Sequence, residues 1–320
     1  MAGNQRRRGA VRKGGTKKGA VVGSGGQRRR GLEGKGPTPR AEVRPGLPKA
    51  RRAAAARKAA GASGRPGGGG RGRTGTAETV AGRNAVVEAL RAGVPVKALY
   101  VAERIDSDDR VREVLKMAAE RGLSVLEAPR PELDRLTAGA VHQGMALTVP
   151  AYQYAHPDDL VAAAHDADEA PLIVALDGVT DPRNLGAVVR SAAAFGAHGV
   201  VVPERRSAGI SVGAWKTSAG AAARISVARA TNLARQLRAY AEEGLFIVGL
   251  AGDGTVDVTD LEVAAEPMCL VVGSEGAGMS RVVAQACDVV ARIPIAREVE
   301  SLNAGVAAGI ALYEIARARR

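Results

Sequence analysis

A glycine-rich turn with one carboxylate is the first segment whose residue types could do chemistry. It spans residues 273–278, Gly-Ser-Glu-Gly-Ala-Gly, and follows a continuous apolar run. Glycines let a ligand approach the backbone closely because no Cβ stands in the way. Glu275 has little packing purpose among them, which favours a ligand site over a plain connecting turn. The spacing GxxGxG differs from the GxGxxG of dinucleotide folds, and no GxxxxGK[ST] phosphate loop occurs in the chain.

Two further segments place polar residues where helices are predicted to begin. Asn184 lies at the start of one predicted helix, and Arg190 interrupts the same helix, which is otherwise almost wholly apolar. A charge in such a place needs a counter-charge or a ligand. In the third segment, Ser301 and Asn303 precede the small-residue run 304–309, which is typical of a helix packed closely against another backbone. Asn184 and Ser301 could instead act as helix caps.

The elements that position these segments form a predicted domain over residues 171–320. Continuous apolar runs at 172–176, 199–202, 245–250, 268–272 and 289–293 are typical of strands buried on both faces of a parallel sheet. Helices are expected over 185–195, 232–242 and 303–317, with Gly196 and Gly244 just past the ends of the first two. This alternation predicts a doubly wound α/β fold, in which ligands bind at the carboxyl ends of the strands.

A smaller α/β domain is predicted over residues 77–152. Helical patterns at 83–91, 111–118 and 131–136 alternate with strand patterns at 98–102, 123–126 and 145–149. Residues 153–170 hold several acids and alanines without a clear period, so we expect a linker there.

The first 76 residues are predicted to be a disordered basic tail. They contain 21 of the 46 Lys and Arg residues and two acids, a net charge of +19. Residues 77–320 carry 25 basic and 31 acidic side chains, a net charge of −6. The tail suits sequence-independent attraction to phosphates, although a solubilising extension without a partner is the alternative. Because the predicted folded part is mildly acidic, it must bind any polyanion through a local basic patch.

The remaining composition points to a cytoplasmic protein without a metal site. The N-terminus has no apolar segment of the kind that a signal peptide needs, and no apolar run of 18 residues predicts a membrane helix. Cys269 and Cys287 are the only cysteines and lack a CxxC spacing, so reduced structural thiols are expected rather than a zinc site.

Taken together and in order, the three segments resemble the motifs of SpoU/TrmH-type SPOUT RNA 2′-O-ribose methyltransferases. The resemblance rests on DPRNLGAVVR, VVGSEGAGMS, and IPI followed by ESLNAGVAAGIALYE, and it covers the chain from Pro171 onward. The stretches VAGRNAVVEAL and AVHQG resemble the small L30e-like RNA-binding domain of bacterial 23S ribosomal RNA guanosine 2′-O-methyltransferases. The tail lies outside the resemblance.

The resemblance implies a trefoil knot at the C-terminus, which is a rare exception to unknotted topology. It also implies an obligate homodimer whose active site is completed across the interface, with S-adenosylmethionine as the methyl donor. Gly273, Ile293 and Leu302 match the positions that contact this donor. The shape of the knot loops, rather than an acidic ribose anchor, is expected to hold it. No metal is required.

The motif positions also imply catalytic roles. Arg190 would activate the ribose hydroxyl or position a phosphate, and stabilisation of the forming alkoxide is preferred, since an arginine with a pKa above about 12 is a poor base. Asn184 and Asn303 would orient the ribose and neighbouring backbone, Ser301 would support Arg190 or the substrate, and Glu275 would hold the arginine or position the nucleophile.

Some choices stay open at this point. The RNA target could be a transfer RNA or the ribosomal target of an antibiotic rather than another 23S site, and a non-catalytic ribosome-assembly factor is the alternative from another class. Trp215, the only tryptophan, could stack on a flipped base or belong to the core or an interface. Arg224 stands where an acidic or polar residue is common in the family, which leaves the RNA contacts of its loop undecided.

Overall fold

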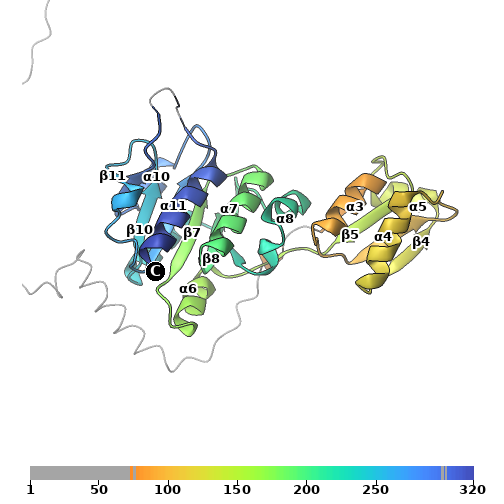
Figure 1. Ribbon diagram of the computed structural model, residues 1–320, viewed down its shortest axis with the longest axis horizontal. Coiled ribbons are helices and arrows are strands. Elements are labelled where there is room, and N and C mark those ends of the chain that lie inside the picture. Colours follow the sequence, from red (N-terminus) through yellow and green to blue (C-terminus); the bar gives the residue numbers. More distant parts are fainter. Residues whose placement is uncertain (1–72, 75–76, 297–298, 300) are drawn as a thin grey trace, which may run out of the picture.

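The computed structural model describes residues 73–74, 77–296, 299 and 301–320 (Figure 1). These residues form two α/β bodies placed end to end along the long axis of the molecule. The predicted disordered tail lies outside the described residues except at its end. There, β1 (Arg73–Thr74) pairs antiparallel with β6 (Gln153–Tyr154), so the predicted tail includes one ordered strand.

The small domain consists of a four-stranded sheet and its helices. The strand order is β2-β5-β3-β4, with β3 parallel to β4 and the other pairs antiparallel. The predicted helices and strands are confirmed, three of them at their predicted bounds. The elements are β2 (Glu78–Ala81), α3 (Arg83–Arg91), β3 (Ala98–Ala102), α4 (Asp109–Glu120), β4 (Val125–Ala128), α5 (Arg130–Leu136) and β5 (Met145–Val149).

The large domain contains a seven-stranded sheet in which every pairing is parallel, as predicted. The strand order is β11-β13-β10-β12-β7-β8-β9. Its strands are β7 (Leu172–Asp177), β8 (Gly199–Pro203), β9 (Ser226–Ala230), β10 (Phe246–Leu250), β11 (Val256–Asp257), β12 (Met268–Gly273) and β13 (Val289–Arg292). Its helices are α6 (Pro157–Asp166), α7 (Pro182–Ala194), α8 (Val212–Ser218), α9 (Leu233–Glu242), α10 (Arg281–Ala284) and α11 (Ala304–Ala318).

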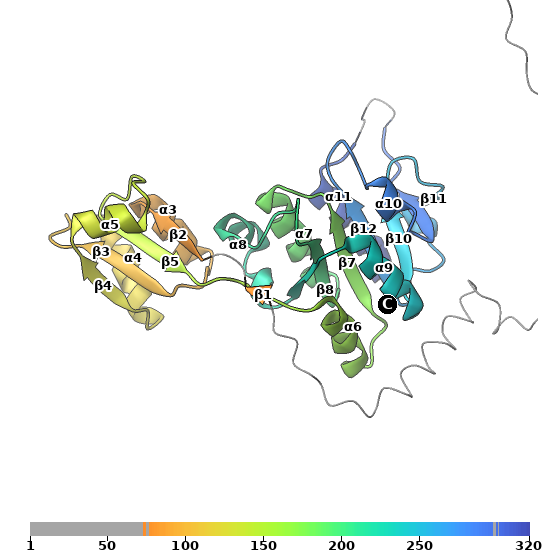
Figure 2. The same cartoon turned by 180° about the vertical axis from the view of Figure 1, so that it is seen from behind.

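Helices cover both faces of the large sheet, so successive residues of a central strand enter different cores. Val174 of β7 belongs to the core beneath α7 and α11, on the face seen in Figure 1. Its neighbour Ile173 belongs to the core beneath α6 and α9, on the face seen in Figure 2. Gly196 and Gly244 adopt φ angles of 75° and 98° after α7 and α9, which confirms them as helix stops.

The expected linker over residues 153–170 is wrong, because most of it folds onto the large domain. Residues 153–154 form β6, and α6 follows at Pro157–Asp166. His156 and Asp159 form a capping box at the start of α6, and Leu160 and Val161 are buried against the sheet. The alanines and acids of this segment blur its helical period, but the capping residues and Pro157 at the first helical position were available signals.

Trp215 of α8 is a core residue. Its side chain is 6% exposed, and its ring meets that of Tyr152 edge-on at 6.2 Å between centroids. The base-stacking alternative would need an accessible ring face, so the structure favours the packing role. The helix α8 and the edge strand β9 were not predicted, because seven- and five-residue elements of mixed polarity carry little periodic signal.

Candidate active site

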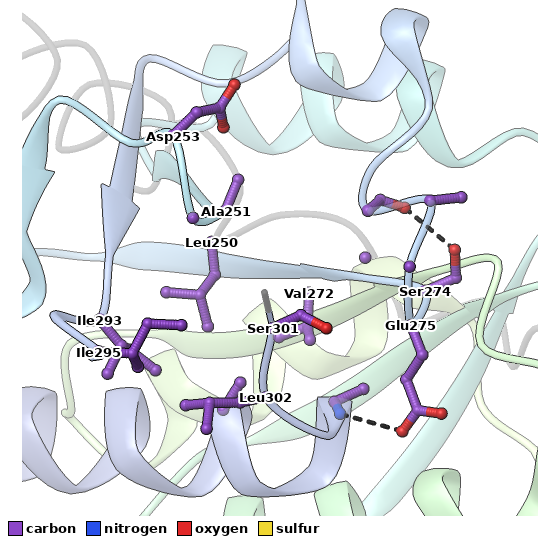
Figure 3. Close-up of a pocket in the computed structure, with 17 residues that line it drawn as sticks. Leu250, Ala251, Asp253, Val272, Ser274, Glu275, Ile293, Ile295, Ser301 and Leu302 are labelled. Atoms are coloured by element: carbon purple, nitrogen blue, oxygen red, sulfur yellow. Dashed lines mark hydrogen bonds between the residues drawn. The ribbon is translucent and has the colours of Figure 1, made fainter. Parts of the chain in front are cut away.

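A cavity of about 310 Å³ opens at the carboxyl ends of β10, β12 and β13 (Figure 3). Parallel strands end at the same edge of the sheet, so the loops that follow them meet there. Four stretches line the cavity: residues 250–253 from the end of β10, 272–278 from the end of β12, Ile293 and Ile295 after β13, and Ser301, Leu302, Ala304 and Ala307 around the start of α11. The volume lies in the range of small-molecule and cofactor sites.

The glycine-rich turn forms one wall of the cavity and is held by its own backbone. Ser274 and Gly278 exchange two backbone hydrogen bonds, of 3.0 and 2.9 Å, and Gly276 and Gly278 have φ angles of 76° and 64°. A Cβ on Gly273 would lie 2.6 Å from the carbonyl oxygen of Gly278, so this position requires glycine. The Asp177 carboxylate at the end of β7 accepts a 2.7 Å bond from the Ser280 amide and thereby braces the turn.

Glu275 joins the turn to the other two predicted segments. Its Oε1 accepts hydrogen bonds from the amide groups of Asn184, at 3.0 Å, and Asn303, and from the backbone amide of Ala304 at 3.4 Å. Asn303 also donates to Oδ1 of Asn184 at 2.9 Å. Residues separated by 91 and 119 positions in the sequence thus form one polar cluster at the edge of the cavity. We call Asn184, Glu275 and Asn303 the polar triad.

Helix starts hold two members of the polar triad in place. Asn303 is the N-cap of α11, where its Oδ1 accepts from the amides of Gly305 and Val306 at 2.9 and 3.2 Å. Asn184 lies in the first turn of α7, which Asp181 caps by accepting from the Arg183 amide at 2.8 Å. The Glu275 carboxylate therefore sits at the start of α11, where the positive end of the helix dipole favours a negative charge.

The three predicted cofactor-contact residues all line the cavity. Gly273 lines it as the first residue of the glycine-rich turn. Ile293 and Leu302 supply aliphatic walls together with Leu250. Ser301 also lines it, beside Leu302. The aliphatic side chains of such a cavity can enclose an uncharged aromatic ring of a ligand. The carboxylates of Asp253 and Glu275, which also line the cavity, can accept hydrogen bonds from the polar groups of that ligand.

Asp253 is a lining residue that the sequence reasoning missed. Its carboxylate stands at the rim of the cavity, three residues beyond the end of β10. We expected no acidic side chain to bind the ribose of the methyl donor, because none follows a strand at the position usual in dinucleotide folds. The available signal was an acid just after an apolar strand, which in open α/β sheets is a common ligand position.

Arg190 does not line this cavity. It follows Asn184 by six residues on α7, which is about 9 Å along a helix and about 240° around it. Its side chain is exposed and lines a different hollow of about 710 Å³. It makes no hydrogen bond or ion pair with the residues that the structure describes, so the counter-charge expected from its apolar surroundings is not found there.

The cysteines lie away from the cavity. Burial raises the pKa of both thiols, that of Cys287 to about 11. Among the described residues, no group of three or more His, Cys, Asp or Glu side chains is placed to hold a metal ion. No helix in the described ranges is long and apolar enough to cross a membrane.

Comparison with known proteins shows to which class this fold and cavity belong. The model of the SpoU rRNA Methylase family matches residues 171–313, and that of the RNA 2′-O ribose methyltransferase substrate-binding family matches residues 79–155. The chain is 58% identical over 320 residues to an uncharacterized tRNA/rRNA methyltransferase of Mycobacterium ulcerans (strain Agy99), with full coverage of both chains. It therefore belongs to the SpoU rRNA methylase family.

Solved structures show the same relationship. The SpoU methyltransferase AviRb from Streptomyces viridochromogenes, in complex with AdoMet, superposes with a TM-score of 0.57 at 26% identity, covering 76% of this chain and 90% of that chain. The AdoMet-bound rRNA methyltransferase from Sinorhizobium meliloti gives a TM-score of 0.52 at 26% identity, covering 85% and 94%. The predicted family, enzyme class and cofactor are confirmed.

Proposed function

We propose that this enzyme transfers the methyl group of S-adenosylmethionine to a ribose 2′-hydroxyl, with a guanosine of 23S ribosomal RNA as the target. The polar triad at the mouth of the cavity is the observation that carries the proposal. The match of residues 79–155 to a substrate-binding domain of RNA 2′-O ribose methyltransferases supports ribose as the acceptor. The small domain would bind the RNA, and a cytoplasmic location belongs to the same proposal.

The cavity fits the cofactor in shape and in charge. Gly273, Ile293 and Leu302 would hold S-adenosylmethionine between the glycine turn and the aliphatic wall, and Asp253 offers a carboxylate to its ribose hydroxyls. S-adenosylmethionine supplies an electrophilic methyl group on a positively charged sulfur. The trefoil knot is part of this proposal, and a strand order that puts β13 between β10 and β11 is compatible with it.

The residues around the cavity would prepare the hydroxyl for attack. Asn184 and Asn303 would orient the ribose, and Ser301, which lines the cavity, would contact the substrate. Every hydrogen bond that the Glu275 carboxylate makes with a described residue uses Oε1, which leaves Oε2 to accept from the hydroxyl or to hold an arginine. A guanidinium near the forming alkoxide would stabilise its charge.

A second copy of the chain would supply that guanidinium. In its own subunit, Arg190 lines a hollow apart from the cavity. One face of α11 presents Val306, Ile310 and Tyr313 to solvent at 52%, 37% and 51% exposure, which is the spacing of a helical stripe. Exposed apolar stripes mark contact surfaces. We propose a homodimer through this α11 stripe, with Arg190 of each subunit completing the partner's site.

Subunit mixing tests the chemistry and the dimer together. Arg190→Ala and Glu275→Ala are each expected to lose transfer of tritium from labelled S-adenosylmethionine to 23S ribosomal RNA. When the two variants are unfolded together and refolded, each mixed dimer contains one intact site, so about a quarter of the wild-type activity should return in an isologous dimer. Nuclease mapping of the product locates the methyl group.

Three outcomes would contradict the proposal. No recovery on mixing places Arg190 in its own subunit's site, and wild-type activity in Arg190→Ala removes it from catalysis. Labelling of a base, or of transfer RNA in preference to 23S ribosomal RNA, overturns the proposed acceptor or the proposed target.

A further inference from the structure

A second hollow lies at the opposite edge of the large sheet from the cofactor cavity. It has a volume of about 710 Å³ and opens where β8 and β9 begin, between α6, α7 and the turn after α8. Its apolar surface comes from short side chains such as Ala163 and Ala193. Arg190 and Arg224 also line it, and we call it the arginine hollow.

The arginine hollow carries positive charge that the described protein does not neutralise. Arg190 and Arg224 are both exposed, and neither makes an ion pair or a side-chain hydrogen bond with any described residue. His198, also in the lining, is already engaged: Nδ1 accepts from the Leu172 amide at 3.1 Å, and Nε2 lies 3.0 Å from a carboxylate oxygen of Glu169. Glu169 contacts His198 and does not itself line the arginine hollow.

We propose that the arginine hollow binds a phosphodiester of the RNA substrate, with Arg224 as a substrate-positioning residue. Two guanidinium groups with like charge repel each other, and an anion between them reverses the sign of that interaction. Arginine suits phosphate because its planar fork can donate two parallel hydrogen bonds. Residues 77–320 have a net charge of −6. An RNA can therefore bind this part of the chain only through a local basic patch, and the arginine hollow is such a patch.

This inference rests on the proposed function, because that function places Arg190 beside the partner's reacting ribose. Arg224 shares the hollow with Arg190 and would therefore hold a phosphate of the same strand close to the target nucleotide. Phosphate contacts fix the register of a nucleic acid without reading its sequence. Arg224 thus positions the strand, whereas the small domain selects it.

The salt dependence of RNA binding tests the inference. Binding of in vitro-transcribed 23S ribosomal RNA is measured by fluorescence anisotropy at increasing salt for wild type, Arg224→Gln and Arg238→Gln. Arg238, an exposed residue on α9 outside the hollow, is the matched control. Losing one phosphate contact should lower the slope of log K against log salt by about 1. The control should keep the wild-type slope, and Arg224→Lys should recover most of it because the slope counts charges.

Kinetics and binding separate a positioning role from a general loss of structure. Arg224→Gln should raise KM for RNA about tenfold with kcat within about twofold of wild type, because the lost contact acts on ground state and transition state alike. Its affinity for S-adenosylhomocysteine, measured by calorimetry, should not change.

Two results would overturn the inference. One is a slope of log K against log salt for RNA binding that does not change in Arg224→Gln. That result would overturn the inference even if millimolar inorganic phosphate binds the arginine hollow, because the hollow would then bind free anions and not the RNA. The other is a monomeric Arg224→Gln in light scattering, which would make the hollow a subunit contact. The salt slope reports binding of RNA phosphates even if the methyl group is found on a base. A failure of the proposed ribose acceptor can therefore be distinguished from a failure of this inference.

Discussion

Glu275 is the residue on which the three predicted segments converge. A single carboxylate oxygen links the glycine turn, the start of α7 and the N-cap of α11. The carboxylate has two functions in this arrangement. It fixes the side-chain amides that would orient the ribose, and it places a negative charge at the edge of the proposed cofactor cavity.

Replacing Glu275 with glutamine is expected to lower kcat/KM for methyl transfer about 10- to 100-fold, since a hydrogen bond to a charged group contributes about 1.5–3 kcal/mol. Affinity for S-adenosylhomocysteine should stay within about twofold, because the turn keeps its backbone bonds between Ser274 and Gly278. Glu262→Gln, the same change at an exposed acid outside the cavity, is the control. A normal rate in Glu275→Gln would exclude a catalytic role, and lost cofactor affinity would reassign the residue to binding.

At the scale of elements, α7 is placed by very close packing against α8 and α11. A Cβ on Gly186 would lie 2.5 Å from the carbonyl oxygen of Ala214, and one on Gly305 would lie 2.8 Å from the Cβ of Ala187. Both glycines let backbones approach closely, which confirms at Gly305 the close packing that the small-residue run after Asn303 predicted. The packing fixes the rotation of α7, which turns Asn184 toward the cofactor cavity and Arg190 away from it.

Gly186→Ala should therefore lower the free energy of unfolding by about 1–3 kcal/mol, the usual cost of overpacking. Urea denaturation followed by circular dichroism measures it. Gly213→Ala is the matched change on α8, where the nearest atoms to a new Cβ are at 3.5 and 3.6 Å and φ is not positive. That variant should be neutral, or more stable by about 0.5 kcal/mol through helix propensity. Equal stability of the two variants would argue against close packing of α7 on α8.

At the scale of the whole molecule, the α11 stripe is an apolar feature that the described part of the chain leaves exposed. It adjoins α7, since the rings of Phe195 and Tyr313 meet edge-on at 5.9 Å. The stripe thus continues toward the helix that carries Arg190. A dimer through this face would bury the stripe and bring the α7 helices of both subunits to the interface.

Ile310→Asp is expected to convert the proposed dimer to a monomer in light scattering, because a buried unpaired carboxylate is strongly unfavourable. The monomer should still bind S-adenosylhomocysteine, whose cavity lies within one chain, but should lose methyl transfer. Val282→Asp makes a comparable change at an exposed aliphatic residue on α10, on the other face of the sheet, and should stay dimeric and active. An active monomeric Ile310→Asp would refute a site shared between subunits.

Much of this protein could be predicted from local sequence. Continuous apolar runs such as 172–176 predicted the parallel strands, because burial on both faces leaves no place for polar residues. Gly273 and Glu275 could be selected from their residue types because a glycine-rich turn and a lone carboxylate are readable over a few positions. Asn303 was selected through the family resemblance, and the N-cap alternative was placed at Ser301, two residues before the actual cap. The capping signals of α6 were equally local, yet its alanines concealed the helical period.

What only the tertiary structure decided depends on contacts between distant parts of the chain. Asn184 donates a hydrogen bond to Glu275 and accepts one from Asn303, and both bonds require the strand order of the folded sheet, which short-range patterns do not encode. The rotation of α7 separated Arg190 from Asn184 and placed it with Arg224, although the motif lists Asn184 and Arg190 together. The spacing of two residues along a helix gives the angle between their side chains around the helix axis. The surface of the protein that each side chain reaches depends on the elements packed around that helix.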